Sequence, residues 1–325
     1  MCQKYDVIIV EDEPYWNLQY PSAYELEKQY RGESQVKESR ESVTTKNKSA
    51  GGYEFLDSLV PSFLTIDTDG RVVRLDTFSK TVAPGARLGW LTAQPAVIER
   101  ITRIAECSTQ QPSGFVQAMV AELLVGPATV NSNSSPGWQM DGWVRWLAGL
   151  RSSYEGRMQT MCRVLEEGKY TVRDDTKQVS AHATSRIFDD SDAWEVIDRA
   201  QMYDFSWPRG GMFVWVKIHL STHPLYPRYS GERLSRALWV HLAKKPYQCI
   251  VAPGMMFAPT AEVMGISHQF LRLCFAAMDG AEVEDTSKRL VQGFRTFWQR
   301  KNLDDLEDPE DERFNVSALL ELMHV

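Results

Sequence analysis

The sequence lacks the features that mark membrane, secreted and nucleic-acid-binding proteins. No apolar run approaches the roughly 20 residues of a membrane-spanning helix, and the first residues resemble neither a secretory signal nor the Met-Gly start of a myristoylated chain. Acidic side chains outnumber basic ones, 43 against 36, for a net charge of −7. Because nucleic acids and anionic membranes attract basic surfaces, we expect neither as a partner. We expect a cytoplasmic protein with small-molecule ligands.

Thiols and imidazoles are few and scattered. The five cysteines are odd in number and show no Cys-x-x-Cys spacing, so we expect reduced, mostly buried thiols. The six histidines show no spacing typical of a zinc site, so we expect no bound metal. A P-loop, a Gly-x-Gly-x-x-Gly fingerprint and a Gly-x-Ser-x-Gly elbow are also missing. Any phosphate site or catalytic centre must therefore be built from other motifs.

Length and composition are those of a globular protein with a large core. Apolar residues make up 43% of the sequence and charged residues 24%. The length of 325 residues predicts about two domains. Apolar side chains recur on one stripe over 143–165, which predicts a long helix that joins the two domains. We place the boundary near the middle of this helix, which gives domains of 1–150 and 151–325.

Two stretches differ from the rest in composition. Residues 24–50 mix charged side chains with Ser, Thr and Gln and hold few large apolar residues, so we expect a surface insertion over 21–55. A short solvated helix at 23–30 is the alternative. Residues 303–313 are acidic, and we expect a solvated tail or helix end there.

Short apolar runs alternate with helical periodicities along the rest of the chain. Strands are predicted at 7–10, 71–76, 87–92, 211–218 and 270–275, and helices at 95–104, 115–124, 143–165, 233–243 and 282–301. The first strand is wholly apolar, which is typical of a strand covered on both faces. Ligand groups gather at the carboxyl ends of such strands, so Asp12 and Tyr15 are candidate site residues.

A second group of candidates follows the predicted strand at 71–76. Thr77, Ser79 and Lys80 come directly after it, and Arg87 lies seven residues beyond Lys80. Hydroxyls and a guanidinium on one turn suit a phosphate dianion. A lysine amine beside them forms an imine with an aldehyde if its surroundings keep it unprotonated. A Ser-Lys pair alone would be an ordinary surface feature.

Asp12 and Tyr15 carry groups that complement this turn. A buried carboxylate beside a pyridine nitrogen favours the protonated ring, which is a better electron sink. A phenol can hydrogen-bond the 3′ oxygen of the same ring. Each segment alone is explained by an ordinary strand-ending turn, but together they supply complementary parts of one site.

These motifs, in this order, resemble those of fold-type I pyridoxal 5′-phosphate (PLP) aminotransferases of class I/II, especially the fungal aromatic amino acid and 2-aminoadipate (kynurenine) aminotransferases. The resemblance is carried by residues 6–16, 76–80, 84–90, 210–215 and 271–275. It implies an α/β fold. Residues 1–150 would form the C-terminal part of a large domain with a mixed, mainly parallel sheet, and residues 151–325 a smaller α+β domain.

The resemblance also implies a role for each candidate residue. Lys80 matches the Schiff-base lysine, which also moves the substrate proton, Asp12 matches the carboxylate on the pyridine nitrogen, and Tyr15 matches the partner of the 3′ oxygen. Arg272 matches the arginine that grips the substrate α-carboxylate in a bidentate pairing. The phosphate contacts are matched by three residues, Thr77, Ser79 and Arg87.

The implied activity is PLP-dependent transfer of an amino group from an aromatic L-amino acid to a 2-oxo acid such as 2-oxoglutarate, in a homodimer. Family members also have an N-terminal segment with a glycine-rich phosphate loop, an aromatic residue that stacks on the cofactor and an asparagine that binds the 3′ oxygen. None of these can be located here, so we expect the chain to correspond to the C-terminal part of such an enzyme. Two alternatives stay open: a truncated, non-catalytic remnant that acts as a scaffold or partner subunit, and a PLP-dependent lyase of the same fold.

Overall fold

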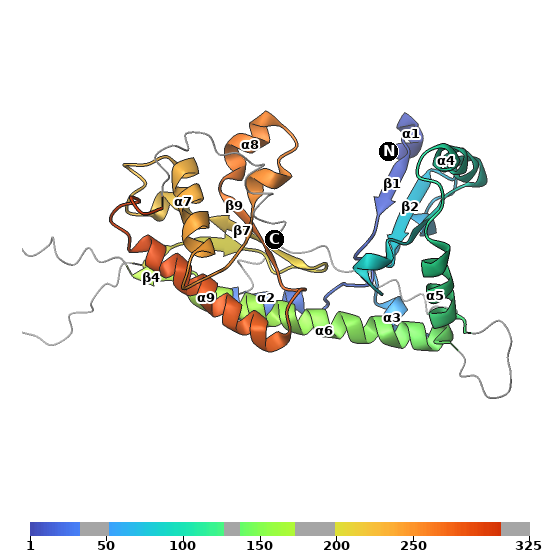
Figure 1. Cartoon of the computed structure of the whole chain (residues 1–325), viewed down its shortest axis with the longest axis horizontal. Coiled ribbons are helices and arrows are strands. Elements are labelled where there is room, and N and C mark those ends of the chain that lie inside the picture. Colours follow the sequence, from blue (N-terminus) through green and yellow to red (C-terminus); the bar gives the residue numbers. More distant parts are fainter. Residues whose placement is uncertain (33–51, 127–136, 173–198, 307–325) are drawn as a thin grey trace, which may run out of the picture. The chain divides into compact units, whose positions relative to one another are not determined.

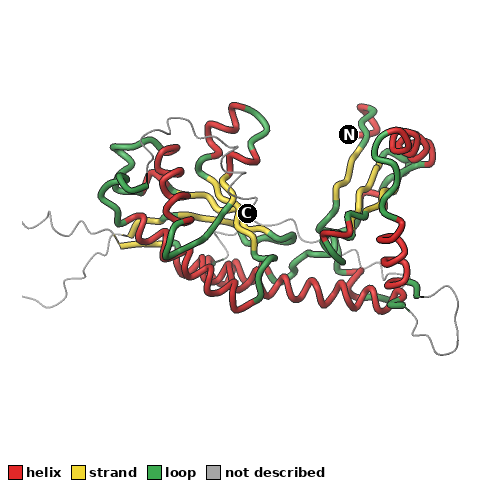
Figure 2. The backbone as a smooth tube through the Cα atoms, in the orientation of Figure 1, coloured by secondary structure: helices red, strands yellow, loops and turns green. Residues whose placement is uncertain are grey.

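The computed structural model describes residues 1–32, 52–126, 137–172 and 199–306. The chain splits into two compact units (Figures 1 and 2). Unit 1 comprises Met1–Glu155 with Arg209–Gly211, and unit 2 comprises Gly156–Pro208 with Met212–Val325. The long helix predicted from the apolar stripe is α6 (Gln139–Gly168), which runs from one unit into the other.

The described residues of unit 1 form a mixed three-stranded sheet of order β1-β2-β3, in which β1 runs parallel and β3 antiparallel to β2. Besides the first part of α6, its described helices and strands are α1 (Cys2–Tyr5), β1 (Ile9–Asp12), α2 (Ala23–Arg31), α3 (Glu54–Asp57), β2 (Val72–Thr77), β3 (Gly89–Thr92), α4 (Pro95–Cys107) and α5 (Gly114–Leu124). Proline opens α4, where its missing N–H leaves no hydrogen bond unmade.

The middle strand, β2, is well covered, whereas β1 is not. Val72 and Val73 are buried, and the turn before them contains Gly70 at φ 71°, a conformation that suits glycine. β1 forms an edge of the described sheet, and Val10 is 63% exposed. The strand predicted at 7–10 therefore forms two residues later, and the expectation that it is covered on both faces is wrong for the described residues.

The described part of unit 2 forms two antiparallel sheets, one of order β4-β5 and one of order β6-β7-β9-β8. Besides the end of α6, its described helices and strands are β4 (Tyr170–Val172), β5 (Arg199–Gln201), β6 (Tyr203–Phe205), β7 (Phe213–Ile218), α7 (Gly231–Ala243), β8 (Ala252–Pro253), α8 (Ala261–Ser267), β9 (Phe270–Cys274) and α9 (Gly280–Trp298).

The core of unit 2 follows from the alternation of its strands. Every second residue of β7 and β9 is buried, as are the apolar stripes of α7 and α9. The two helices contact each other, and the ring of Tyr203 on β6 lies 4.7 Å from that of Phe294 on α9. The N-terminus of α9 is closed by a reciprocal capping box between Asp279 and Glu282.

The described ends of the predicted insertion at 21–55 are not loosely attached loops. Ala23 and Glu27 on α2 are buried, and so is Phe55 on α3. The Glu27 carboxylate pairs with Arg209 at 2.7 Å and with Arg31 at 3.2 Å, which is why a charged helix can be buried here. The alternative of a helix at 23–30 is therefore confirmed in its position, but the helix is not fully solvated, since Ala23 and Glu27 are buried. The insertion over 21–55 as a whole stays a prediction, because residues 33–51 lie outside the described part.

Two further expectations need correction. Leu303 and Leu306, at the start of the stretch expected to be a solvated tail, are buried, and residues 307–325 lie outside the described part. All five cysteines are free, but Cys162 and Cys249 alone are buried, so the thiols are not mostly buried.

None of the helices within the described ranges is long and apolar enough to cross a membrane.

Candidate active site

The candidate residues of unit 1 gather at one edge of its sheet because β1 and β2 are parallel. Asp12, the last residue of β1, is paired with Leu75, and the Glu13 amide donates a hydrogen bond to the Leu75 carbonyl oxygen at 3.0 Å. β2 ends two residues later, at Thr77. The loops that follow both strands therefore lie together at the carboxyl-terminal end of the strand pair, which is where ligands bind in such sheets.

The turn after β2 brings the predicted phosphate contacts together. The Thr77 hydroxyl accepts a hydrogen bond from the Ser79 amide at 3.0 Å and lies 2.9 Å from the Ser79 hydroxyl. The Arg87 guanidinium reaches the same Ser79 hydroxyl at 3.4 Å. Gly89 allows the chain to return closely, because a Cβ there would lie 2.6 Å from the Asp76 carbonyl oxygen. Two hydroxyls and a guanidinium thus form one cluster.

Lys80 lies beside this cluster and faces Tyr15. Its Nζ is 5.7 Å from the centre of the Tyr15 ring, and both residues are half-buried. The next residue, Thr81, is buried, and its carbonyl oxygen accepts a hydrogen bond from the Trp146 indole at 2.7 Å. The structure therefore places Tyr15, after β1, next to Lys80, after β2, as the sequence predicted. Trp146 of α6 also contacts the turn that contains Lys80.

Asp12 has surroundings that differ from the expected buried carboxylate. Its side chain is exposed, whereas the neighbouring Glu11 is 6% exposed. Successive side chains of a strand point to opposite faces, so Asp12 and Glu11 lie on different sides of the sheet. The carboxylate is thus at the predicted edge of the sheet without being buried by the described residues.

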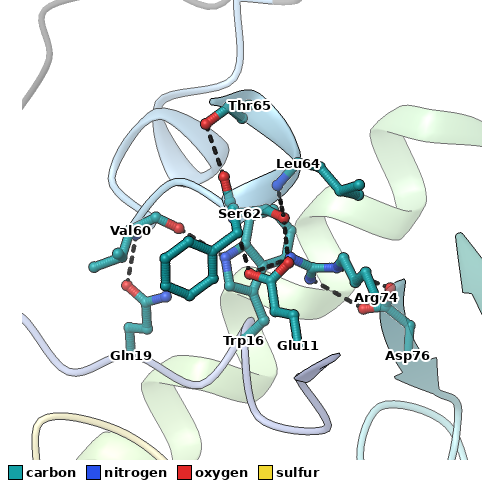
Figure 3. A network of polar contacts seen from close by, with 10 residues as sticks. Glu11, Trp16, Gln19, Val60, Ser62, Leu64, Thr65, Arg74 and Asp76 are labelled. Atoms are coloured by element: carbon teal, nitrogen blue, oxygen red, sulfur yellow. Dashed lines mark hydrogen bonds and ion pairs between the residues drawn. The ribbon is translucent and has the colours of Figure 1, made fainter. Parts of the chain in front are cut away.

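Glu11 belongs to a polar network on the face of the sheet opposite Asp12, which no sequence motif indicated (Figure 3). The Glu11 carboxylate accepts hydrogen bonds from the Ser62 hydroxyl at 2.6 Å and the Phe63 amide at 3.1 Å. The Arg74 guanidinium pairs with Glu11 at 3.5 Å and with Asp76 at 2.9 Å. The available signal was the alternation Arg74-Leu75-Asp76 in the strand predicted at 71–76, which places two opposite charges on one face of the sheet.

Electrostatics in this network follow from burial and from the excess of carboxylates. Burial raises the pKa of Glu13, the neighbouring carboxylates of Glu11, Asp76 and Asp12 raise it further, and Arg74 works in the opposite direction. Burial disfavours the charge of Arg74, but its hydrogen bonds to Asp76 and the nearby carboxylates leave its pKa raised. Arg74 therefore stays charged among these acids.

Arg272 belongs to unit 2, on β9 opposite Trp215 of β7. Its guanidinium carbon lies 4.1 Å from the centre of the Phe213 ring and 4.3 Å from that of Phe257. No carboxylate of the described residues forms an ion pair with it. The two rings hold the guanidinium by cation–π contacts and leave its charge uncompensated within that set. Its association with Lys80 stays a prediction.

Within the described ranges, no three His, Cys, Asp or Glu side chains form a cluster able to hold a metal ion. The groups present at the carboxyl ends of β1 and β2 are a lysine amine, a phenol, a carboxylate and a cluster of two hydroxyls and a guanidinium. These groups suit an aldehyde cofactor with a phosphate handle better than they suit acyl or phosphoryl transfer.

Comparison with known proteins also indicates an enzyme that uses such a cofactor. The family model for aminotransferase class I and II matches residues 1–290. An aromatic amino acid aminotransferase of Schizosaccharomyces pombe is 29% identical over 292 residues, which are 90% of this chain and 48% of that protein. An L-tyrosine:2-oxoglutarate aminotransferase of Tapinella panuoides is 35% identical over 223 residues, 68% of this chain and 32% of that protein.

Solved structures agree with these relatives. The crystal structure of an aminotransferase from Candida albicans superimposes with a TM-score of 0.61 and 28% identity, and covers 92% of this chain and 52% of that one. This chain thus spans about half the length of the S. pombe and C. albicans proteins. The family and the fold class predicted from the motifs are confirmed. The chain belongs to the aminotransferase class I and II family.

Proposed function

We propose that the chain takes part in PLP-dependent transfer of an amino group from an aromatic L-amino acid to a 2-oxo acid such as 2-oxoglutarate. The observation that carries the proposal is the Lys80 amine, which lies over the Tyr15 ring next to the Thr77–Ser79–Arg87 donor cluster. The substrate classes are taken from the printed names of the relatives, one an aromatic amino acid aminotransferase and one an L-tyrosine:2-oxoglutarate aminotransferase.

The residues at this edge fit the cofactor that the family implies. Hydroxyl groups and a guanidinium within hydrogen-bond reach of one another suit a phosphate dianion. When bound, pyridoxal phosphate supplies an electron sink for the bonding electrons of the substrate α-carbon. Lys80 would hold its aldehyde carbon and carry the proton from the α-carbon, Tyr15 would hydrogen-bond the 3′ oxygen, and Asp12 would accept from the ring nitrogen.

Arg272 completes the proposal on the substrate side. A guanidinium stacked on two aromatic rings keeps its planar fork fixed, and a fixed fork recognises a carboxylate in two parallel hydrogen bonds. The lack of an ion-pair partner among the described residues leaves the charge of Arg272 free for such a ligand. An amino acid and a 2-oxo acid both carry this carboxylate, so one arginine could serve both substrates.

The direct test is to locate the lysine that reacts with pyridoxal phosphate. The full chain is incubated with the cofactor and treated with borohydride, which fixes the cofactor to the condensed lysine as a secondary amine, and the labelled peptide is mapped. Label is expected on Lys80 and is lost in Lys80→Ala. Lys4→Ala is the matched control, because Lys4 also lies over a tyrosine ring, at 5.1 Å. Label elsewhere, or label that survives Lys80→Ala, contradicts the proposal.

Turnover separates the proposal from its alternatives. With L-tyrosine and 2-oxoglutarate, amino transfer yields an oxo acid and glutamate without free ammonia, whereas a lyase releases ammonia. Label on Lys80 with neither product supports a partner or scaffold role, which the exposed edge strand β1 favours. We extend the proposal to a homodimer, supported by the exposed apolar residues Phe115 and Met119 on α5, and sedimentation measures that oligomeric state. The cytoplasmic location expected from the sequence stays a proposal.

A further inference from the structure

Arg74 is the centre of the buried network behind the candidate site. It is 5% exposed and sits in the middle strand, paired with Glu11 on β1. The carboxylates of Glu11, Glu13 and Asp76 all act on it electrostatically. Among the described residues, Arg74 is the cation that offsets the negative charge of these carboxylates where the parallel strands β1 and β2 end.

The contacts of Arg74 reach both arms of the candidate site. Its Nε and Nη2 donate to the two carboxylate oxygens of Asp76 at 2.9 and 3.0 Å, directly before Thr77. Its Nη1 reaches Glu11 at 3.5 Å, directly before Asp12. Its guanidinium carbon lies 4.5 Å from the centre of the Trp16 ring, directly after Tyr15. Each contact is thus one residue away from a candidate site residue.

Trp16 is fixed in turn by the rest of the network (Figure 3). Its indole donates to the Val60 carbonyl oxygen at 2.8 Å, and the Val60 amide donates to the Gln19 side chain at 2.8 Å. The segment that carries Tyr15 is therefore held between Arg74 on one side and the chain around residue 60 on the other.

We propose that Arg74 is a positioning residue, which holds the ends of β1 and β2 so that Asp12, Tyr15 and Lys80 face one edge of the sheet. It acts from the opposite face, because Glu11, Arg74 and Asp76 alternate with Asp12 and Thr77 along their strands. A guanidinium is needed for this task, since lysine cannot bind Asp76 in a bidentate manner and reach Glu11 as well. The inference rests on the proposed function for its consequence, but its geometry can be tested alone.

The first test needs no cofactor. Peptide-resolved hydrogen exchange is measured on the full chain and on Arg74→Met, with Arg71→Met as the matched control. Arg71 precedes the same strand and pairs with Asp6 at 2.7 Å and Asp69 at 3.2 Å, away from the candidate residues. Exchange in peptides covering 11–16 and 77–82 is expected to rise at least tenfold in Arg74→Met and less than twofold in Arg71→Met. The inference is overturned if exchange in these peptides stays unchanged in both variants, or if it rises equally in both.

The second test uses the labelling of Lys80. In the full chain, the ratio of label on Lys80 to label on Lys4 in the same sample measures how well Lys80 is presented. The ratio is expected to fall at least tenfold in Arg74→Met, to recover in part in Arg74→Lys, which keeps the charge, and to stay within twofold in Arg71→Met. A ratio unchanged in Arg74→Met overturns the inference. If the unsubstituted chain takes no label at Lys80, the proposed function fails and the exchange experiment still decides the role of Arg74.

Discussion

The hydrogen bond from the Trp146 indole to the Thr81 carbonyl oxygen is a single-residue support for the lysine turn. Thr81 is buried, so its carbonyl would lose its partner in Trp146→Phe, which keeps a ring but no donor. We expect a loss of about 1 kcal/mol in the stability of unit 1, since Trp146 is partly exposed and water can replace some of the bond. Urea unfolding measures this loss, and label on Lys80 should fall in parallel.

Trp239→Phe is the control for this prediction. Trp239 makes the same kind of bond in unit 2, where its indole donates to the Val251 carbonyl oxygen at 2.8 Å. It should cost similar stability and leave Lys80 labelling unchanged. If both variants reduce labelling equally, the effect belongs to the whole fold and Trp146 has no special relation to Lys80.

At the scale of elements, α9 depends on its cap. Asp279 accepts a hydrogen bond from the Glu282 amide at 2.9 Å, and Glu282 bonds back to the Asp279 amide. Asp279→Ala should destabilise unit 2 by about 0.5–2 kcal/mol. Lys288→Ala, which removes an exposed ion pair with Glu284 on the same helix, should cost less, because such pairs contribute about 0–1 kcal/mol. Thermal unfolding compares the two, and equal losses would contradict a role for the cap.

Elements that depend on local pattern could be predicted from the sequence. The apolar stripe of α6 and the proline that opens α4 gave helices close to their observed bounds. The cluster of Thr77, Ser79 and Arg87 was also local, since one turn holds all three. The strands β5 and β6 were missed because both are three residues long, too short for a period of two to be seen.

At the scale of the whole molecule, contacts between distant residues could not be predicted. Glu27 is buried because Arg209 pairs with it across 182 positions in the chain. Composition alone shows a charged segment and predicts solvent exposure for it. Arg74 and Glu11 likewise require the register of two strands to be known, and that register is set by the packing of the sheet. The two members of each ion pair are thus far apart in the sequence, and their interaction can be recognised only once the fold brings them together.

The distribution of histidines predicts that acid weakens the two units unequally. Unit 1 contains no histidine, whereas His223 and His241 are buried in unit 2. Burial lowers the pKa of both, and it also lowers that of His219 in the same unit. A lowered pKa in the folded state means that stability is full above the unfolded value of about 6.5 and declines as the pH falls below it. Glu13 in unit 1 has a raised pKa, so the stability it contributes is lost as pH rises and not as it falls.

Between pH 8 and pH 5.5, unit 2 should therefore lose stability while unit 1 keeps most of its own. Equilibration in urea at each pH, followed by a pulse of hydrogen exchange resolved by peptide, gives a separate midpoint for each unit. The variant His223→Asn with His241→Gln takes up no proton at these two positions, so the pH dependence of unit 2 should become shallower, with the remaining slope due to His219. A midpoint for unit 1 that falls as far as that for unit 2, or a variant that keeps the full slope, would show that other groups govern the acid response.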